Sequence, residues 1–150
     1  MGNIIVILKL FEKTIVENDV KMFILCNPHN PIGKVWSKDD LKQIGNICKK
    51  HHVYVVSDEI HMDFVYQGHT HTPFYNVDES FKEFTLICTA PSKTFNLAAL
   101  QTSNIIIADE KMREAFNQGK DASGVKLIQI FLVLMLVKQP ILLEQNGWMN

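Results

Sequence analysis

Three short polar segments in this chain carry side chains that could do chemistry together. Asn30 lies in Asn-Pro-His-Asn-Pro-Ile-Gly, Asp58 lies in Ser-Asp-Glu-Ile-His, and Lys93 lies in Ala-Pro-Ser-Lys-Thr. Each segment follows an apolar run that is typical of a buried strand. Because open α/β sheets bind their ligands at the carboxyl ends of their strands, we expect an amide, a carboxylate and an amine at one sheet edge.

This set of side chains meets the requirements of a pyridoxal phosphate site. There, a lysine amine forms a Schiff base, a carboxylate keeps the pyridine nitrogen protonated, and an amide hydrogen-bonds the ring hydroxyl. Each residue alone also has a structural explanation. Asp58 could cap a strand end, Asn30 could be a turn residue, and Lys93 could be a solvated surface lysine. The order of the three motifs along the chain favours the catalytic interpretation.

The elements that must position these residues alternate between strands and helices. Apolar, strand-forming runs predict strands over 21–26, 53–56, 84–88 and 103–108. Strands this apolar are typical of a mostly parallel sheet that is covered by helices on both faces. The expected fold class is therefore α/β, with no domain boundary along residues 1–150.

The helices are predicted from their caps and from apolar spacing. Ser37 is expected to cap a helix with its end near Lys49 and Lys50, and Asp109 to cap one that runs to about Gln118. A short helix is expected over 95–100. Residues 67–79 are rich in turn formers and are expected to form a surface loop near the site.

Composition excludes several partner classes. A formal net charge of -1 gives no reason to expect nucleic acid or an anionic membrane as a partner. Cys26, Cys48 and Cys88 have no metal-ligand spacing and imply no disulfide framework, which fits the cytoplasm. His69 and His71 are close in sequence but lack partners for a metal site, so a loop role is expected. The apolar run 127–137 is shorter than the roughly 20 residues of a membrane span.

At these motifs the chain resembles the class I and II aminotransferase group of fold-type I pyridoxal phosphate enzymes. More narrowly, it resembles the cystathionine β-lyase, or C–S lyase, branch of that group. The resemblance covers residues from about 11 to 126 and implies the central part of the large, cofactor-binding domain. His61, which follows Asp-Glu-Ile, separates this branch from typical aminotransferases, which have tyrosine at that position.

The resemblance implies a role for each motif residue. Lys93 would form the Schiff base and then move the proton at the substrate Cα. Asp58 would pair with the pyridinium nitrogen, Asn30 would hydrogen-bond the ring O3′, Ser92 would help to hold the cofactor phosphate, and His61 would lie near the ring hydroxyl. No metal is implied.

The implied substrate is an amino acid with a Cβ–S bond, such as cystathionine, which is cleaved to pyruvate, ammonia and a thiol. Such a reaction belongs to amino-acid metabolism and methionine biosynthesis. The family usually forms homodimers, in which each active site borrows residues from the neighbour.

The chain also departs from the family pattern. No segment matches the glycine-containing phosphate loop, the aromatic residue that stacks on the ring, or the arginine that grips the substrate carboxylate. Arg113 is the only arginine and is a poor candidate for that grip. The alternatives are therefore an aminotransferase of the same group or a catalytically inactive fragment. A generic nucleotide-binding domain is disfavoured, because no glycine-rich loop follows a predicted strand.

The resemblance stops after residue 126. Back-translating the following residues with suitable codons and shifting the frame by one base yields a family-like peptide. We therefore hypothesise that residues from about Leu127 onward are an out-of-frame translation. The sequence of the encoding DNA tests this idea, since a DNA that cannot yield the shifted peptide would refute it.

Overall fold

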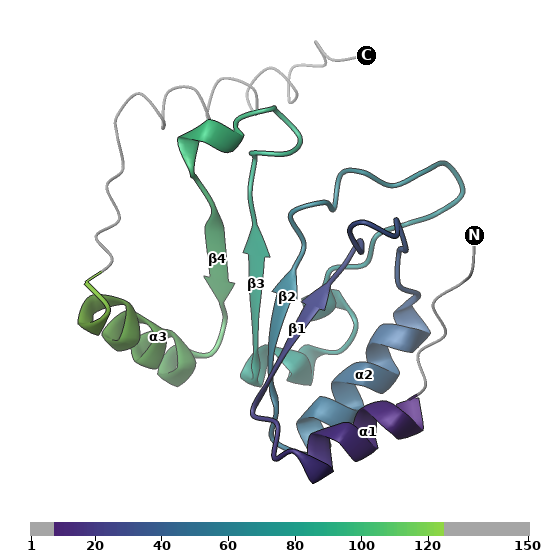
Figure 1. The fold of residues 1–150 in the computed structure, drawn as a ribbon, viewed down its shortest axis with the longest axis vertical. Coiled ribbons are helices and arrows are strands. Elements are labelled where there is room, and N and C mark those ends of the chain that lie inside the picture. The colour runs from purple at the N-terminus through teal and green to yellow at the C-terminus, as the bar shows by residue number, and fades with distance from the viewer. Residues whose placement is uncertain (1–7, 125–150) are drawn as a thin grey trace.

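The computed structural model describes residues 8–124, which form a four-stranded sheet with helices around it (Figure 1). The strands lie side by side in the order β1 (Met22–Cys26), β2 (Tyr54–Asp58), β3 (Thr85–Thr89) and β4 (Asn104–Ile107). β1, β2 and β3 are parallel, and β4 runs antiparallel to β3. The α/β class and the mostly parallel sheet are therefore confirmed. The tail from Leu127 onward lies outside the described residues.

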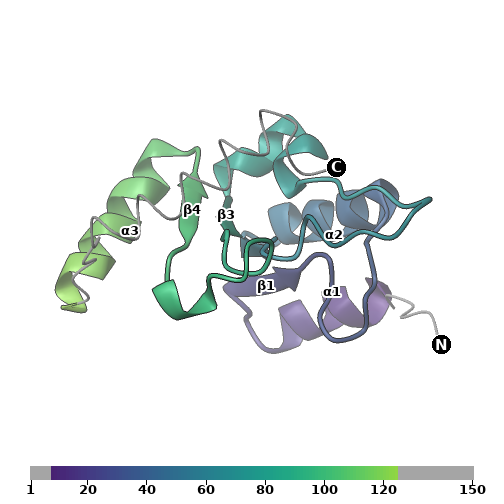
Figure 2. The same ribbon diagram turned by 90° about the horizontal axis from the view of Figure 1, so that it is seen from above.

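Over residues 8–124, three α-helices accompany the sheet: α1 (Leu8–Glu17), α2 (Lys38–Lys50) and α3 (Glu110–Ala122). Shorter 3₁₀ helices occupy Phe74–Asn76, Glu79–Glu83 and Ala98–Leu100. α1 and α2 lie on one side of the sheet, and α3 lies on the other side, next to β4 (Figures 1 and 2). None of the helices within residues 8–124 has the length and apolarity that a bilayer span requires.

The start of α2 follows from its sequence. The Ser37 hydroxyl accepts a hydrogen bond from the backbone N–H of Asp40 at 3.1 Å, which is the expected N-cap. Asp39 and Asp40 occupy the first turn, and Lys49 and Lys50 the last, so that both ends complement the helix dipole. The cap therefore fixes where the chain leaves the loop after β1 and begins to cover the sheet.

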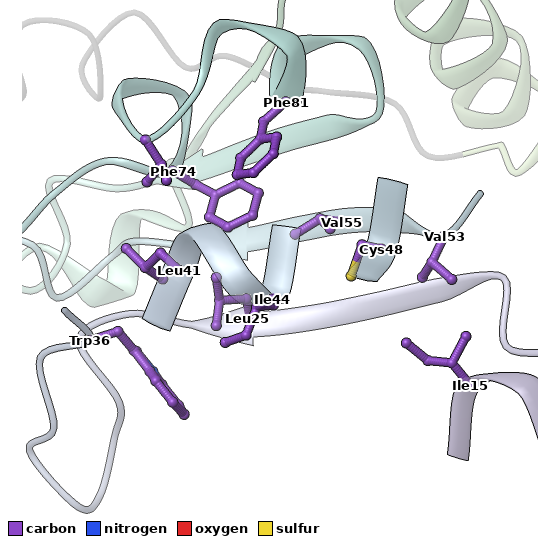
Figure 3. Close-up of a cluster of buried hydrophobic side chains, with 11 residues drawn as sticks. Ile15, Leu25, Trp36, Leu41, Ile44, Cys48, Val53, Val55, Phe74 and Phe81 are labelled. Atoms are coloured by element: carbon purple, nitrogen blue, oxygen red, sulfur yellow. The ribbon is translucent and has the colours of Figure 1, made fainter. Parts of the chain in front are cut away.

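The core lies between α2 and one face of the sheet. Leu41, Ile44 and Cys48 point from α2 toward Leu25 and Val55, and all five are buried. Figure 3 shows this cluster with the rings of Phe74 and Phe81, which stack with their centroids 5.1 Å apart. Burying one such aliphatic or aromatic side chain contributes roughly 1.5–3 kcal/mol, so this layer holds the strands in register.

The opposite face of the sheet is less covered. Alternation along the strands places Met22, Ile24 and Tyr54 on the side away from α2, where they are 56%, 66% and 51% exposed. Ile105 of β4 is also exposed. α3 buries none of its own residues and contacts the sheet at β4. Within residues 8–124, the second helical layer therefore covers only one end of the sheet.

Three parts of the described chain differ from the sequence-based expectation. α1 was not anticipated, although Ile15 on its inner face is buried in the core. Residues 67–79 are not a simple surface loop, because Phe74 is fully buried and Val77 is nearly so. α3 extends to Ala122, four residues beyond the predicted end, and the helix expected over 95–100 is only the short 3₁₀ turn Ala98–Leu100.

Candidate active site

The three sequence motifs follow neighbouring strands at one edge of the sheet. Asn30 lies in the turn after β1, Asp58 is the last residue of β2, and Lys93 lies in the turn after β3. Because these strands are parallel, their carboxyl ends meet at the same edge, where the connecting loops gather in Figure 1. The predicted placement of the motifs at strand ends is confirmed.

Asp58 occupies the centre of this edge. In the sheet register it lies between Cys26 of β1 and Cys88 of β3. Its carbonyl accepts a hydrogen bond from the N–H of Asn27 at 3.0 Å, and its carboxylate accepts one from the N–H of Ile60 at 3.3 Å. The carboxylate is half-buried and forms no ion pair with another described residue. It is therefore available to a cationic ligand group.

The electrostatics of this edge are negative. Burial raises the pKa of the Cys88 thiol, and the carboxylates of Asp58 and Glu59 raise it further. A cation placed beside Asp58 would be stabilised by the same charges.

Asn30 and His61 share a cavity of about 430 Å³ between the loop after β1 and the loop after β2. The cavity is lined by residues of both loops, which are Pro28, His29, Asn30, Pro31, Gly33, His61, Asp63, Phe64, Val65 and Tyr66. The Nδ1 atoms of His29 and His61 are buried and have no hydrogen-bond partner among the described residues. Two imidazole nitrogens are thus left for a ligand or for water within the cavity wall.

Lys93 and Ser92 lie in a tight turn beside this cavity and do not line it. The turn is closed by hydrogen bonds from the N–H of Phe95 to Pro91 O at 3.0 Å and from the N–H of Leu97 to Ser92 O at 2.9 Å. Lys93 is exposed, and its amine makes no hydrogen bond or ion pair within the described residues. The Lys93 amine is therefore not committed to another described residue.

A side-chain hydrogen bond ties the lysine turn to the cavity. The hydroxyl of Thr94, next to Lys93, donates to the carboxylate of Asp63 in the cavity wall. The structure thus brings Asn30 and His61 together at one cavity and joins the Lys93 turn to the loop after β2, which carries His61. Asp58, Ser92 and Lys93 are not part of the cavity lining.

Sequence reasoning missed one polar cluster next to the site. Glu59 is 1% exposed and accepts hydrogen bonds from Ser57, from the N–H of Phe74 and from His71. His71, expected only to serve a loop, is thus a partner of a buried carboxylate. The signal that could have found it is alternation: Ser57 and Glu59 flank Asp58 and point toward the covered face. Within residues 8–124, no group of three or more potential ligands is placed to hold a metal ion.

A family model and several known proteins match this chain. The family model "Aminotransferase class I and II" matches residues 6–137. The chain belongs to this family. The match is wider at both ends than the range of about 11–126 over which the motifs indicated a resemblance.

One curated relative is "Cystathionine beta-lyase PatB" of Bacillus subtilis (strain 168), with 46% identity over 122 residues. The match covers 81% of this chain and 32% of the relative. This chain therefore spans about a third of the length of that relative. The expected resemblance to the cystathionine β-lyase branch is confirmed.

Two solved structures give the same picture. A pyridoxal phosphate-bound putative aminotransferase from Clostridium difficile 630 matches with a TM-score of 0.77 and 45% identity, covering 83% of this chain and 32% of its own. Cystalysin from Treponema denticola, which contains pyridoxal 5'-phosphate, matches with a TM-score of 0.75 and 42% identity, covering 79% and 30%. The fold of residues 8–124 is therefore that of part of these larger enzymes.

Proposed function

We propose that this chain is the part of a pyridoxal phosphate-dependent carbon–sulfur β-lyase that carries its lysine, aspartate and asparagine. The substrate would be cystathionine or a related amino acid with a Cβ–S bond, and the products pyruvate, ammonia and a thiol. The observation that carries the proposal is the placement of Asn30, Asp58 and Lys93 after three neighbouring parallel strands. The 46% identity to a protein named cystathionine β-lyase supports it.

The residues present fit this cofactor in three respects. Lys93 has a free amine, Asp58 has a carboxylate without an ion-pair partner among the described residues, and Asn30 lines a cavity beside His61. Ser92, whose carbonyl closes the lysine turn, keeps its hydroxyl next to Lys93 and would help to hold the phosphate. When bound, pyridoxal phosphate supplies an electron sink that lowers the energy of deprotonation at the substrate Cα.

Each of the candidate site residues would then have its own role toward the cofactor or the substrate. Asp58 would hold a proton on the pyridine nitrogen by stabilising the cation. Lys93 would bind the cofactor covalently and afterwards use its Nζ to take the proton from the substrate Cα. Asn30 would orient the ring through its O3′. His61, whose Nδ1 is buried without a partner in the described part of the chain, would lie close to that hydroxyl.

An aminotransferase of the same group is the second candidate. It is favoured by the matching family model and by the similar structure of a putative aminotransferase. His61, in place of the tyrosine of typical aminotransferases, favours the lyase. A pyruvate-release assay with cystathionine, run beside an amino-transfer assay with a 2-oxo acid, separates the two reactions.

We also propose that the whole protein works on small amino acids in the cytoplasm and as a homodimer, as is usual for the family. The three cysteines of the chain are free thiols, which supports a reducing compartment. Sedimentation of the protein with and without cofactor tests the dimer. A catalytically inactive fragment is the alternative that the next experiment addresses.

The test is a borohydride trap. The chain is mixed with pyridoxal phosphate and reduced, and the modified lysine is located by mass spectrometry. We expect specific labelling at Lys93 that is lost in Lys93→Ala and strongly reduced in Asp58→Asn, while the control Lys111→Ala on α3 is labelled like wild type. Equal labelling of many surface lysines would show that the motifs no longer form a cofactor site.

A further inference from the structure

The buried carboxylate next to Asp58 has a complete set of hydrogen-bond donors. Glu59 Oε1 accepts from the Ser57 hydroxyl at 2.8 Å and from the N–H of Phe74 at 2.9 Å. Glu59 Oε2 lies 3.1 Å from Nε2 of His71. Since a carboxylate buried to this extent is costly unless its oxygens are paired, this arrangement must be kept for the strand end to fold as it does.

His71 donates to Glu59 through Nε2. The His71 side chain is 8% exposed, and its Nδ1 is buried without a hydrogen-bond partner within residues 8–124. A proton on Nδ1 would be a buried donor without an acceptor, whereas a bare nitrogen there is less costly. The geometry therefore favours the tautomer that carries its hydrogen on Nε2 and directs it at the carboxylate.

The pair joins two segments that are distant in sequence. Glu59 directly follows the last residue of β2, and His71 precedes the 3₁₀ helix Phe74–Asn76, whose Phe74 ring is buried in the core. The same carboxylate holds the main chain of Phe74. The carboxyl end of β2 is therefore anchored to a rigid part of the molecule rather than to a free loop.

Asp58 is the residue that this anchoring affects. Ser57 and Glu59 are both buried on the covered side of the sheet, so the side chain between them must point to the other side. The main chain at this point is also held on both flanks, since Asn27 N–H donates to Asp58 O and Glu59 N–H donates to Cys88 O. With Glu59 fixed, little rotation of the Asp58 backbone is possible.

We infer that Glu59 and His71 are positioning residues that hold the Asp58 carboxylate toward the cofactor ring. This inference rests on the proposed role of Asp58 as the partner of the pyridine nitrogen. Neither Glu59 nor His71 lines the cavity, so their effect passes through the backbone of Asp58. Loss of the His71 donor leaves a buried carboxylate oxygen unpaired, which loosens the strand end.

The first test uses amide hydrogen exchange measured by NMR on the chain without cofactor. The N–H of Ile60 donates to the Asp58 carboxylate and the N–H of Asn27 to its carbonyl, so both report the position of this residue. In His71→Leu we expect their exchange to speed up about tenfold, while that of the Leu25 amide in β1 changes less than about threefold. Equal acceleration of all three amides, or of none, would overturn the inference.

Two further variants serve as matched comparisons. His71→Gln keeps an N–H donor close to the position of Nε2 and is expected to exchange within about threefold of wild type. His69→Leu removes an exposed histidine of the same loop and is expected to change nothing. If His71→Leu does not fold, Ser57→Ala removes another donor to Glu59 and must show the same selective pattern, with the Ile60 and Asn27 amides accelerated about tenfold and the Leu25 amide less than about threefold.

The second test separates this inference from the proposed function. If wild type is labelled at Lys93 in the borohydride trap, His71→Leu should need about tenfold more pyridoxal phosphate for half-maximal labelling, and His71→Gln should not. Unchanged cofactor affinity in a folded His71→Leu would refute the positioning role. If wild type is not labelled at Lys93, the proposed function fails, and the exchange pattern alone decides whether the pair fixes Asp58.

Discussion

Replacing Gly45 with alanine should destabilise the protein, although alanine is the better helix former. Gly45 lies in α2 against the ring of Phe81, and a Cβ at Gly45 would stand 2.2 Å from Cε2 and 2.3 Å from Cζ of that ring. Ordinary contact begins at 3.4 Å, so the ring or the helix would have to move by about 1.2 Å. Neither has room to move. Phe81 is fully buried between Phe74 and Phe84, with ring centroids 5.1 and 5.5 Å away.

The expected change in the free energy of unfolding of Gly45→Ala is the sum of two opposing contributions. Overpacking of a well-filled core costs about 3 kcal/mol at the upper end of its usual range, and this close approach belongs there. Alanine in place of glycine inside a helix contributes about 1 kcal/mol in the other direction. The expected net loss in the free energy of unfolding of Gly45→Ala is therefore about 2 kcal/mol, or about a thirtyfold change in the folding equilibrium.

The assay is urea denaturation followed by circular dichroism, with Gly119→Ala as the matched control. Gly119 is a helical glycine of α3, where an added Cβ would meet no atom of the described residues within 4 Å. Gly119→Ala should therefore gain up to about 1 kcal/mol. In a Phe81→Leu background, Gly45→Ala should lose most of its cost. Equal stabilisation by both alanines in the otherwise wild-type chain would refute the packing described here.

Three further predictions concern Cys48, Tyr75 and Ser37. Burial raises the pKa of Cys48 from 9.0 to about 12. Its thiolate fraction near neutral pH should therefore lie on the order of a thousandfold below that of a free thiol. The rate of Cys48 alkylation in the folded protein should be lower by the same factor. Burial also raises the pKa of Tyr75. Its neutral phenol therefore contributes stability below about pH 10, and this stability is lost as the pH rises through the pKa of the folded state. In denaturation experiments, Tyr75→Phe should lose less stability than wild type between about pH 9 and pH 11. Tyr75→Phe also removes the hydroxyl that donates to Thr85 O at 2.6 Å, which should cost about 1–2 kcal/mol at neutral pH. Ser37→Ala should lower the free energy of unfolding by about 1 kcal/mol through loss of the α2 cap. Ser37→Asp should keep the cap and the stability. An equal loss in both variants would contradict the capping role.

The sequence was most informative where local rules decide the structure. Apolar runs located all four strands to within about two residues, and Ser37 located the start of α2, because burial and capping act over a few neighbouring positions. The direction of β4 could not be read in the same way. Parallel and antiparallel pairing depend on where the chain passes between strands, and the turn after Lys93 gives no local signal of it.

Long-range packing explains the main errors. Residues 67–79 have the composition of a surface loop, but Phe74 and Val77 find a place against α2 and Phe81 that no local pattern reveals. The partnership of Glu59 with His71 was missed for the same reason, since it depends on how a loop of twelve residues returns to the sheet. The motifs indicated which residues share the sheet edge. They could not show that, of the candidate site residues, Asn30 and His61 line the described cavity whereas Asp58, Ser92 and Lys93 do not.

The hydrogen bond between Thr94 and Asp63 has a consequence for how the protein can vary. These residues are 31 positions apart, yet each lies within two residues of a candidate site residue, Lys93 in one loop and His61 in the other. The hydrogen bond thus links the two loops, and its loss would remove this link between them. Among natural variants of this protein, the identities at positions 63 and 94 should change together, since an acceptor without its donor would let the two loops drift apart.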